Sequence, residues 1–330
     1  MPLIDTDPDS QIDAMRERLS DADAGVRRVA LLDFADVESV DLLPAIVAVL
    51  RDDPDPDLRA EAARALAGWG HGDVVEALAD ALGDEPVVRN AAAQSLSELK
   101  DATAAACLVR HAGSTDRFTC CAALRALREL RVPAAALPAT HALDHPDAGV
   151  RREAVGVLGW LRHAPALSRL AAIANGDLDP EVRRAATGAL GFASLAELPL
   201  VLGALCERLE DSAWQVREEA ATTLGKVTDL AAPGSDMRSA AGTALRRAME
   251  DDYWQVRLRA ARSLGRLRDL LALDVLVETL VHQVGNLRKE AAIALGEIGD
   301  ARAARALQAA AADPDPEVRK AVRIALERLS

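Results

Sequence analysis

Residues 177–191 read DLDPEVRRAATGALG, and this phrase decides the fold. An aspartate stands six residues before Arg183, and Val182 directly precedes that arginine. Ala186 follows three residues after the arginine and Leu190 seven residues after it. Val182, Ala186 and Leu190 therefore have the spacing i, i+4, i+8, which places them on one face of a helix. We expect a helix that buries this apolar stripe against its neighbours.

The same phrase recurs from one end of the chain to the other. An apolar residue followed by arginine occurs nine times in this phase, and Phe118-Thr119 is a tenth, decayed copy. The nine pairs are Val26-Arg27, Leu58-Arg59, Val88-Arg89, Val150-Arg151, Val182-Arg183, Val216-Arg217, Val256-Arg257, Leu287-Arg288 and Val318-Arg319. Successive copies are about thirty to forty residues apart, and such a period indicates a solenoid of stacked units.

Each repeat is expected to be a helical hairpin. In the last repeat, residues 301–311 lack helix breakers, and Asp313-Pro314-Asp315-Pro316 then ends the first helix. Glu317 opens the second helix, which we expect to reach Leu329. Only 2% of the residues are aromatic, so the interior consists mainly of Ala, Leu and Val. The prediction is an all-α, right-handed α-solenoid (α–α superhelix) of about ten hairpins, forming one continuous domain over residues 1–330.

Two places depart from the repeat. The unit near residues 102–132 has Thr119 where the other copies have arginine, and a Gly-Ser-Thr-Asp turn at residues 113–116. Residues 228–236 form a polar, breaker-rich loop insertion, which accounts for the longest step between copies. Either place could affect curvature or partner binding.

Charge and composition limit the possible partners and compartments. The chain has 39 basic and 52 acidic residues, a net charge of −13, which disfavours nucleic acid as a partner. No apolar run is long enough to span a membrane, and the first residues resemble neither a signal peptide nor an anchor. Four cysteines without framework spacing suit a reducing compartment. We expect a cytoplasmic protein.

The repeated arginines have two possible roles. An aspartate often stands six residues before the arginine, so each guanidinium could bridge turn carboxylates or carbonyls within or between repeats. Alternatively, the arginines could bind an anionic ligand. Because the arginine keeps the phase of the repeat, we favour the structural role. The predicted structural ladder is Asp21, Arg27, Asp53, Arg59, Asp177, Arg183, Asp211, Arg217, Asp251, Arg257, Asp313 and Arg319.

The full pattern D-x-x-x-x-[VL]-R-x-x-A-x-x-x-L-G resembles the HEAT-like repeats of the phycobilisome (PBS) lyase type. The resemblance covers nearly the whole chain and implies an armadillo-like superhelix. It does not specify an activity, because such repeats serve lyases, scaffolds, adaptors and assembly factors.

In repeats of this type the second helices line a concave groove, where the phrase Trp-Gln-Val-Arg occurs twice, in adjacent units. Tryptophan is favoured in binding hot spots, although it could equally pack on the next repeat. The predicted partner-binding residues are Trp214, Gln215, Glu218, Trp254, Gln255, Arg259, Arg262, Arg184 and Arg152. Tyr253 would extend the same surface.

Other candidate sites favour their structural interpretations. His141, Asp144 and His145 form H-x-x-D-H, but Pro146 places His145 in a turn and no third metal ligand is apparent. Cys120 and Cys121 follow Thr119, and a reactive role would need a lowered thiol pKa. We therefore expect no catalytic residue, no metal and no cofactor.

The leading hypothesis is a protein-interaction module, a scaffold, adaptor or assembly factor that binds a protein or peptide in its groove. The acidic charge suggests a basic or amphipathic segment. The alternative is an enzyme or a lyase subunit related to bilin lyases. The resemblance also offers deoxyhypusine hydroxylase, whose iron-binding His-Glu pairs this chain lacks, and HEAT-like DNA glycosylases, whose basic groove conflicts with the net charge.

Overall fold

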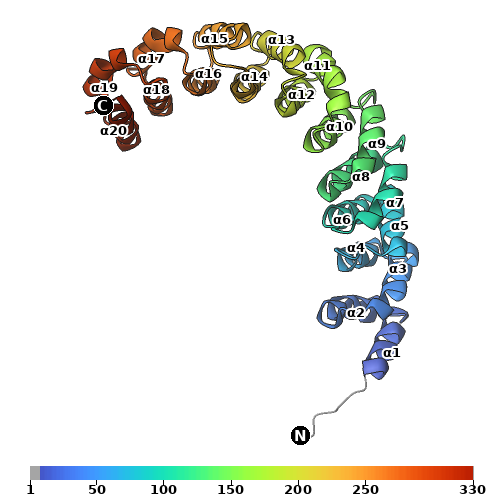
Figure 1. Ribbon diagram of the computed structural model, residues 1–330. Coiled ribbons are helices and arrows are strands. Elements are labelled where there is room, and N and C mark those ends of the chain that lie inside the picture. The colour runs from blue at the N-terminus through green and yellow to red at the C-terminus, as the bar shows by residue number, and fades with distance from the viewer. Residues whose placement is uncertain (1–7, 330) are drawn as a thin grey trace. The chain divides into compact units, whose positions relative to one another are not determined.

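The computed structural model describes residues 8–329, and the α-helices of this part are arranged as successive pairs (Figure 1). No β-strand occurs between residues 8 and 329. The prediction of an all-α solenoid of about ten hairpins is confirmed. The chain divides between Leu161 and Arg162 into an N-terminal and a C-terminal unit. The predicted continuous domain also includes residues 1–7 and 330, which lie outside the described residues.

The N-terminal unit stacks five hairpins, with odd-numbered first helices in one row and even-numbered second helices in the other (Figure 1). Its helices are α1 (Pro8–Leu19), α2 (Ala24–Val37), α3 (Leu43–Asp52), α4 (Pro56–Ala65), α5 (Gly72–Asp80), α6 (Pro86–Ser97), α7 (Ala105–His111), α8 (Arg117–Leu130), α9 (Ala136–Ala142) and α10 (Ala148–Trp160).

The C-terminal unit repeats this arrangement, and its second helices lie on the inner side of its own curve (Figure 1). Its helices are α11 (Leu167–Gly176), α12 (Pro180–Ala189), α13 (Leu198–Arg208), α14 (Trp214–Val227), α15 (Asp236–Ala248), α16 (Trp254–Leu267), α17 (Leu273–Thr279), α18 (Gly285–Ile298), α19 (Ala304–Ala310) and α20 (Pro316–Leu329). None of the helices between residues 8 and 329 is both long and apolar enough to cross a bilayer.

Short 3-10 turns complete many hairpins. They are η1 (Val40–Leu42), η2 (Ala81–Gly83), η3 (Ala102–Ala104), η4 (Pro133–Ala135), η5 (Ala164–Ala166), η6 (Leu190–Phe192), η7 (Thr228–Leu230), η8 (Leu270–Ala272) and η9 (Ala301–Ala303). Most of them lead directly into a first helix, and the tighter turn lets the chain reverse direction over few residues.

The second helix α12 shows how the repeat phrase folds. Asp179 caps it by accepting a hydrogen bond from the Glu181 amide at 2.8 Å, and Pro180 occupies the first turn, where its missing N–H costs nothing. Val182, at 1% exposure, and Ala186, at 0%, face the neighbouring helices. The i, i+4 stripe read from the sequence is therefore the buried face.

Glycines late in the second helices allow close packing of successive repeats. A Cβ atom on Gly265 would lie 2.7 Å from the Cα of Ala294, and one on Gly296 would lie 2.8 Å from the Cα of Ala325. Both glycines are helical rather than terminal, so their role is close contact between α16, α18 and α20.

The irregular repeat has a register one residue away from the predicted one. In the other repeats the helix cap stands four residues before the arginine, and in α8 the cap is Asp116. Thr119, Ala123 and Leu127 form the buried stripe, so Thr119 occupies the valine position and Cys120 the arginine position. The alignment of Thr119 with arginine was wrong, because a β-branched threonine fills the place of valine while Phe118 lies outside the stripe.

The predicted loop at residues 228–236 is also shorter than expected. Thr228–Leu230 forms η7, and α15 begins at Asp236, so only residues 231–235 lie between the two elements. The remaining surplus residues extend α15, which has 13 residues where α17 and α19 have 7.

Two glycine substitutions should have opposite effects on stability. Gly265→Ala must push the backbone of α18 away, and we expect it to destabilise by about 1–3 kcal/mol. Gly203→Ala, within α13, meets no atom within 4 Å and should stabilise by about 0.5–1 kcal/mol through helix propensity. Urea unfolding of the two variants would measure both changes, and an equal effect of the two would contradict the close-packing role.

Candidate functional site

The ladder arginines link neighbouring repeats through carboxylates. Arg217 donates from Nε to Oδ2 of Asp251 at 2.6 Å and from Nη2 to Oδ1 at 2.9 Å. Its Nη1 donates to the backbone oxygen of Asp211 in its own turn at 2.8 Å. Each guanidinium therefore joins its own turn to the aspartate of the next repeat, the bidentate geometry that arginine favours. Such pairs, which we call rungs, include Arg27–Asp53, Arg59–Asp84, Arg183–Asp211, Arg217–Asp251 and Arg288–Asp313.

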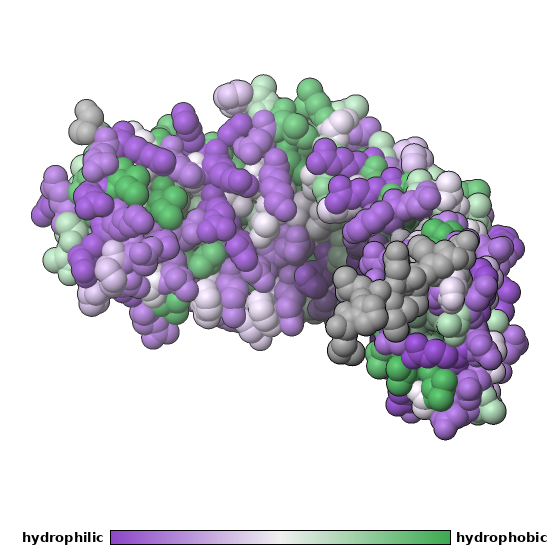
Figure 2. All heavy atoms as spheres, turned by 90° about the horizontal axis from the view of Figure 1, so that it is seen from below, coloured by the Kyte–Doolittle hydropathy of each residue, from purple (hydrophilic) through white to green (hydrophobic). Residues whose placement is uncertain are grey.

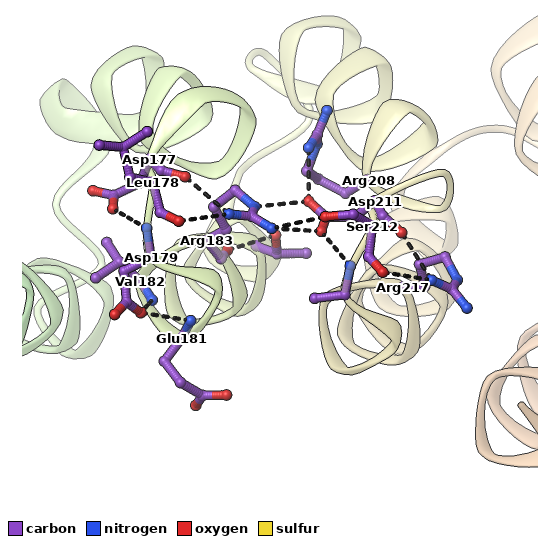
Figure 3. Close-up of polar contacts among 12 residues, drawn as sticks. Asp177, Leu178, Asp179, Glu181, Val182, Arg183, Arg208, Asp211, Ser212 and Arg217 are labelled. Carbon is purple, nitrogen blue, oxygen red and sulfur yellow. Dashed lines mark hydrogen bonds and ion pairs between the residues drawn. The ribbon is translucent and has the colours of Figure 1, made fainter.

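Figure 3 shows one rung with its surroundings. The Arg183 side chain is 12% exposed and that of Asp211 is 2% exposed. Arg208 makes an additional bond to Asp211 at 2.8 Å, and the Ala213 amide donates to it at 2.9 Å. Burial acts to raise the pKa of Asp211, but these hydrogen bonds and the Arg183 charge outweigh it, so the pKa is lowered. The guanidinium N–H donors of these arginines are therefore occupied by hydrogen bonds within the repeat stack.

Within the first and last predicted pairs, Asp21–Arg27 and Asp313–Arg319, the link runs through a backbone oxygen of the aspartate. Arg27 donates to the backbone oxygen of Asp21 at 2.8 Å, and Arg319 donates to that of Asp313 at 2.8 Å. Sequence reasoning missed Asp84, because it stands five rather than six residues before Arg89. It also omitted Arg288 as the partner of Asp313, since the residue six before Arg288 is a histidine.

The irregular repeat lacks both ladder residues: the aspartate that would bind the preceding repeat and the arginine that would bind the following one. The neutral residue Ser114 occupies the aspartate position, so Arg89 has no carboxylate to bind there. Its guanidinium instead lies over the Phe118 ring, 4.7 Å from the centroid. The Nε of Arg89 is buried without a hydrogen-bond partner. Cys120, at the arginine position, is buried and bonds the backbone oxygen of Ala112. Two consecutive second-helix interfaces, α6–α8 and α8–α10, thus lack the bidentate arginine–aspartate pair at the repeat positions.

The surroundings of the candidate cysteines and histidines do not favour a reactive or metal-binding role. Burial raises the pKa of Cys120 to about 11, and that of Cys121 to about 11, so both thiols stay protonated near neutral pH. His141 is exposed on α9, whereas Nδ1 of His145 accepts from the Asp147 amide at 3.0 Å. Across residues 8–329 no group of three His, Cys, Asp or Glu side chains is arranged to hold a metal ion.

A histidine replaces the aspartate of one further rung. Nδ1 of His282 accepts from the Val284 amide at 3.0 Å, as the aspartates do in the other turns. A neutral ring then carries its proton on Nε2, which lies 3.0 Å from Nη2 of Arg257, so two donors face each other. Burial, with the charges of Arg257 and Arg288, lowers the pKa of His282.

A second kind of clamp connects two of the interfaces that lack the first. On the inner row, Arg262 binds the buried Glu290 through two hydrogen bonds of 2.7 Å between α16 and α18. Between α8 and α10, Arg125 binds the buried Glu153 at 2.7 Å. The glutamates stand two residues after the arginine position, where sequence reasoning did not look for a clamp.

The predicted partner surface centres on the starts of α14 and α16. Trp214 and Tyr253 stack with ring centroids 5.3 Å apart and an interplanar angle of 11°, which joins the two repeats. Tyr253 remains 44% exposed, and both tryptophans are partly accessible. We call Trp214, Tyr253 and Trp254 the aromatic patch.

Most charged residues near the aromatic patch are already paired. Glu218 accepts from Arg259 at 3.0 Å, and Glu181 accepts from Arg184 at 2.8 Å. Gln215 is partly accessible, and Oε1 of Gln255 is buried without a partner in the described structure. Arg152 is exposed on α10, in the N-terminal unit, whereas the other predicted partner-binding residues belong to the C-terminal unit.

Family models for HEAT repeats match residues 43–120, 119–191 and 242–327, and a HEAT-repeat model also matches residues 201–231. These segments include more than half of the chain. The chain belongs to the HEAT-repeat family. Its Asp–Arg rungs are thus the internal links of a HEAT stack.

Solved structures share this HEAT fold. A crystal structure of an engineered protein is 23% identical, with a TM-score of 0.55, over 99% of this chain and 97% of that one. A chain from the structure of Kap95p with RanGDP is 15% identical, with a TM-score of 0.63, over 99% of this chain and 49% of that one. At these identities the likeness shows the fold alone. No curated protein sequence matches the chain.

Removing different ladder arginines should have graded costs. Arg217→Ala leaves the buried Asp251 without an ionic partner, and we expect a loss of about 3 kcal/mol. Arg183→Ala should cost less, about 1–2 kcal/mol, because Arg208 still pairs with Asp211. Arg89→Ala, which loses the Phe118 ring contact and no bidentate pair, should cost about 1 kcal/mol or less. Chemical denaturation would measure the series, and equal losses at the three positions would contradict the role of the rungs.

His282→Asp should complete the defective rung. A carboxylate can accept both from the Val284 amide and from Arg257, so we expect stabilisation by about 1–2 kcal/mol at neutral pH. Because the folded-state pKa of His282 is lowered, wild-type stability is full above about pH 6.5 and declines as the pH falls through that lower value. The advantage of the variant should therefore widen between pH 8 and pH 5 in thermal unfolding. A constant difference would show that His282 does not titrate in this way.

Proposed function

We propose that this HEAT-repeat chain is a protein-interaction module whose inner row of second helices in the C-terminal unit binds a segment of a partner protein. The observation that carries the proposal is the aromatic patch. Trp214 and Trp254 start neighbouring helices, and Tyr253 stacks on Trp214 while staying 44% exposed. Rigid, partly exposed aromatic side chains supply contact area at a low entropic cost.

The ladder supports this function indirectly. Because bidentate links to buried aspartates fix successive helices, the inner surface is ordered before a partner arrives. The same links occupy the ladder arginines, so recognition is assigned to neighbouring positions on the second helices. Kap95p, which shares the fold, is described as binding RanGDP, an example of a HEAT stack with a protein partner.

The surface favours a partner with both polar and apolar groups. Seen from the side of its second helices, the C-terminal unit is mostly hydrophilic, with separate hydrophobic patches between hydrophilic residues (Figure 2). Around the aromatic patch, Glu218 and Arg259 neutralise each other, as do Glu181 and Arg184. Local charge thus favours neither sign there, whereas the net charge of −13 favours encounter with a basic or amphipathic segment.

The finer assignments are part of the proposal. The chain would act in the cytoplasm as a scaffold, adaptor or assembly factor, as one continuous solenoid. Its relation to PBS-lyase-type repeats, and to bilin lyase subunits as an alternative function, stays a prediction that the absorbance spectrum of purified protein would test.

The aromatic patch can be tested with a matched control. We expect the double change Trp214→Ala and Trp254→Ala to remove partners recovered by affinity purification from the source cytoplasm. Trp160→Ala, which removes a tryptophan that is 49% exposed on α10, should leave them unchanged. Circular dichroism would first establish that each variant keeps its helical content. If the double variant recovers the same partners as wild type, the patch is not the binding surface.

A further inference from the structure

Three successive second helices of the C-terminal unit surround a hollow at their C-terminal ends. Its volume is about 710 Å³, and its polar lining comes from α16, α18, α20 and η7. The charged residues around it are Arg266, Arg268, Arg328, Glu297 and Asp229. We call this the arginine hollow.

Close helix packing brings these side chains together. Gly265 and Gly296 line the hollow, and neither has room for a Cβ atom against the backbone of the next helix. The arginines therefore come from repeats whose second helices are nearly in contact. Arg268 is held outward by a left-handed backbone conformation at the end of α16, with φ of 51°.

The three arginines differ from the ladder arginines in making no bidentate pair, although the charges of Arg328 and Arg266 act on the Glu297 carboxylate. Among residues 8–329, Arg266, Arg268 and Arg328 make no side-chain hydrogen bond or ion pair, although most arginines of the inner row do. Arg266 and Arg328 stand in last turns, where the helix dipole favours a cation. That dipole supplies only about half a charge per helix end, so it places the guanidinium groups without neutralising them.

The mixed charge of the hollow selects the kind of ligand. Three guanidinium groups and two carboxylates leave a net charge of about +1, which suits single carboxylates better than phosphate dianions. Glu297 and Asp229 can also accept hydrogen bonds, and a peptide supplies backbone N–H donors that a phosphate lacks. A nucleic acid backbone would be repelled by the rest of this acidic chain.

An apolar surface lies one helical turn before the arginine hollow. Ile293 precedes Glu297 by four residues and Ile324 precedes Arg328 by four, so each pair shares a helix face. Ile324 is 40% exposed and Ile293 is partly accessible. A partner segment can therefore place apolar side chains on the isoleucines and carboxylates in the hollow.

We propose that the arginine hollow binds Asp or Glu side chains of an acidic, amphipathic segment of a partner protein. This inference rests on the proposed function and names the partner class for the same row of helices. It differs from the expectation drawn from net charge alone, because arginines outnumber carboxylates in the lining of the hollow.

A display library of random short peptides, selected on the full chain, tests the inference. Selection is run in parallel on wild type, on Arg266→Ala with Arg328→Ala, and on Arg305→Ala with Arg323→Ala. The second pair removes the same charge from exposed arginines outside the hollow. All substituted residues are exposed, and circular dichroism verifies the fold of each variant.

We expect peptides selected on wild type and on the control to be enriched in Asp and Glu, and this enrichment to vanish on the hollow variant. One enriched peptide, synthesised with a fluorescent label, should bind the hollow variant about ten-fold more weakly than wild type in anisotropy titrations, with no change for the control. Inorganic phosphate at millimolar concentration should not displace it.

Other outcomes separate the two proposals. Enrichment of basic or uncharged peptides whose binding depends on Trp214 and Trp254 would overturn the acidic partner while leaving the interaction function intact. Arginine-dependent binding of phosphate or of single-stranded DNA in place of peptide would overturn the partner class. No enriched peptide on wild type would count against both.

Discussion

The bidentate contact between an arginine of one repeat and an aspartate of the next is the interaction on which this structure depends. It connects a helix start to a neighbouring turn, and the aspartate at the same time accepts an amide of its own turn, as Asp211 does from Ala213. A single carboxylate thus determines both the shape of a turn and the position of the adjacent repeat. Since the partners are largely buried, removing one leaves an uncompensated charge, and the pair is maintained as a unit.

This use of arginine separates stability from recognition. Guanidinium groups bound to Asp53, Asp211 or Asp251 have their donors occupied, and they contribute nothing to a ligand. Within residues 8–329, guanidinium groups that donate no hydrogen bond occur where the repeat pattern does not specify a partner, some of them near the ends of the second helices. Arg266 and Arg328 are such positions. A small-residue core allows this arrangement, because glycines let successive helices approach until their exposed ends form one surface.

The sequence predicts the ladder well because its chemistry is periodic. The phase of Arg183 and Asp211 follows from spacing alone, and so does the buried stripe. That each arginine binds the aspartate of the following repeat could not be predicted in the same way. It depends on the distance between stacked repeats, which the sequence of one repeat does not specify. Where the repeat pattern decays, the polarity of a residue is a poor guide to its position. Thr119 was aligned with arginine, although its β-branched side chain replaces valine in the buried stripe. The arginine hollow was missed because Arg268 lies beyond the end of its helix and depends on a left-handed turn.

Interfaces without a ladder carboxylate show how the stack is otherwise secured. Between α16 and α18 the histidine rung coincides with the Arg262–Glu290 clamp, and between α8 and α10 the missing arginine coincides with the Arg125–Glu153 clamp. The glutamates are buried; Glu290 is bound by both donors of Arg262, whereas Glu153 shares its two oxygens between Arg125 and Arg128. Between α6 and α8 neither link is present; Arg89 lies over the Phe118 ring, and its charge acts on Asp116 without an ion pair. Two inner helices without a bidentate link should separate at a lower cost than their clamped neighbours, so we expect this interface to open most easily within the N-terminal unit.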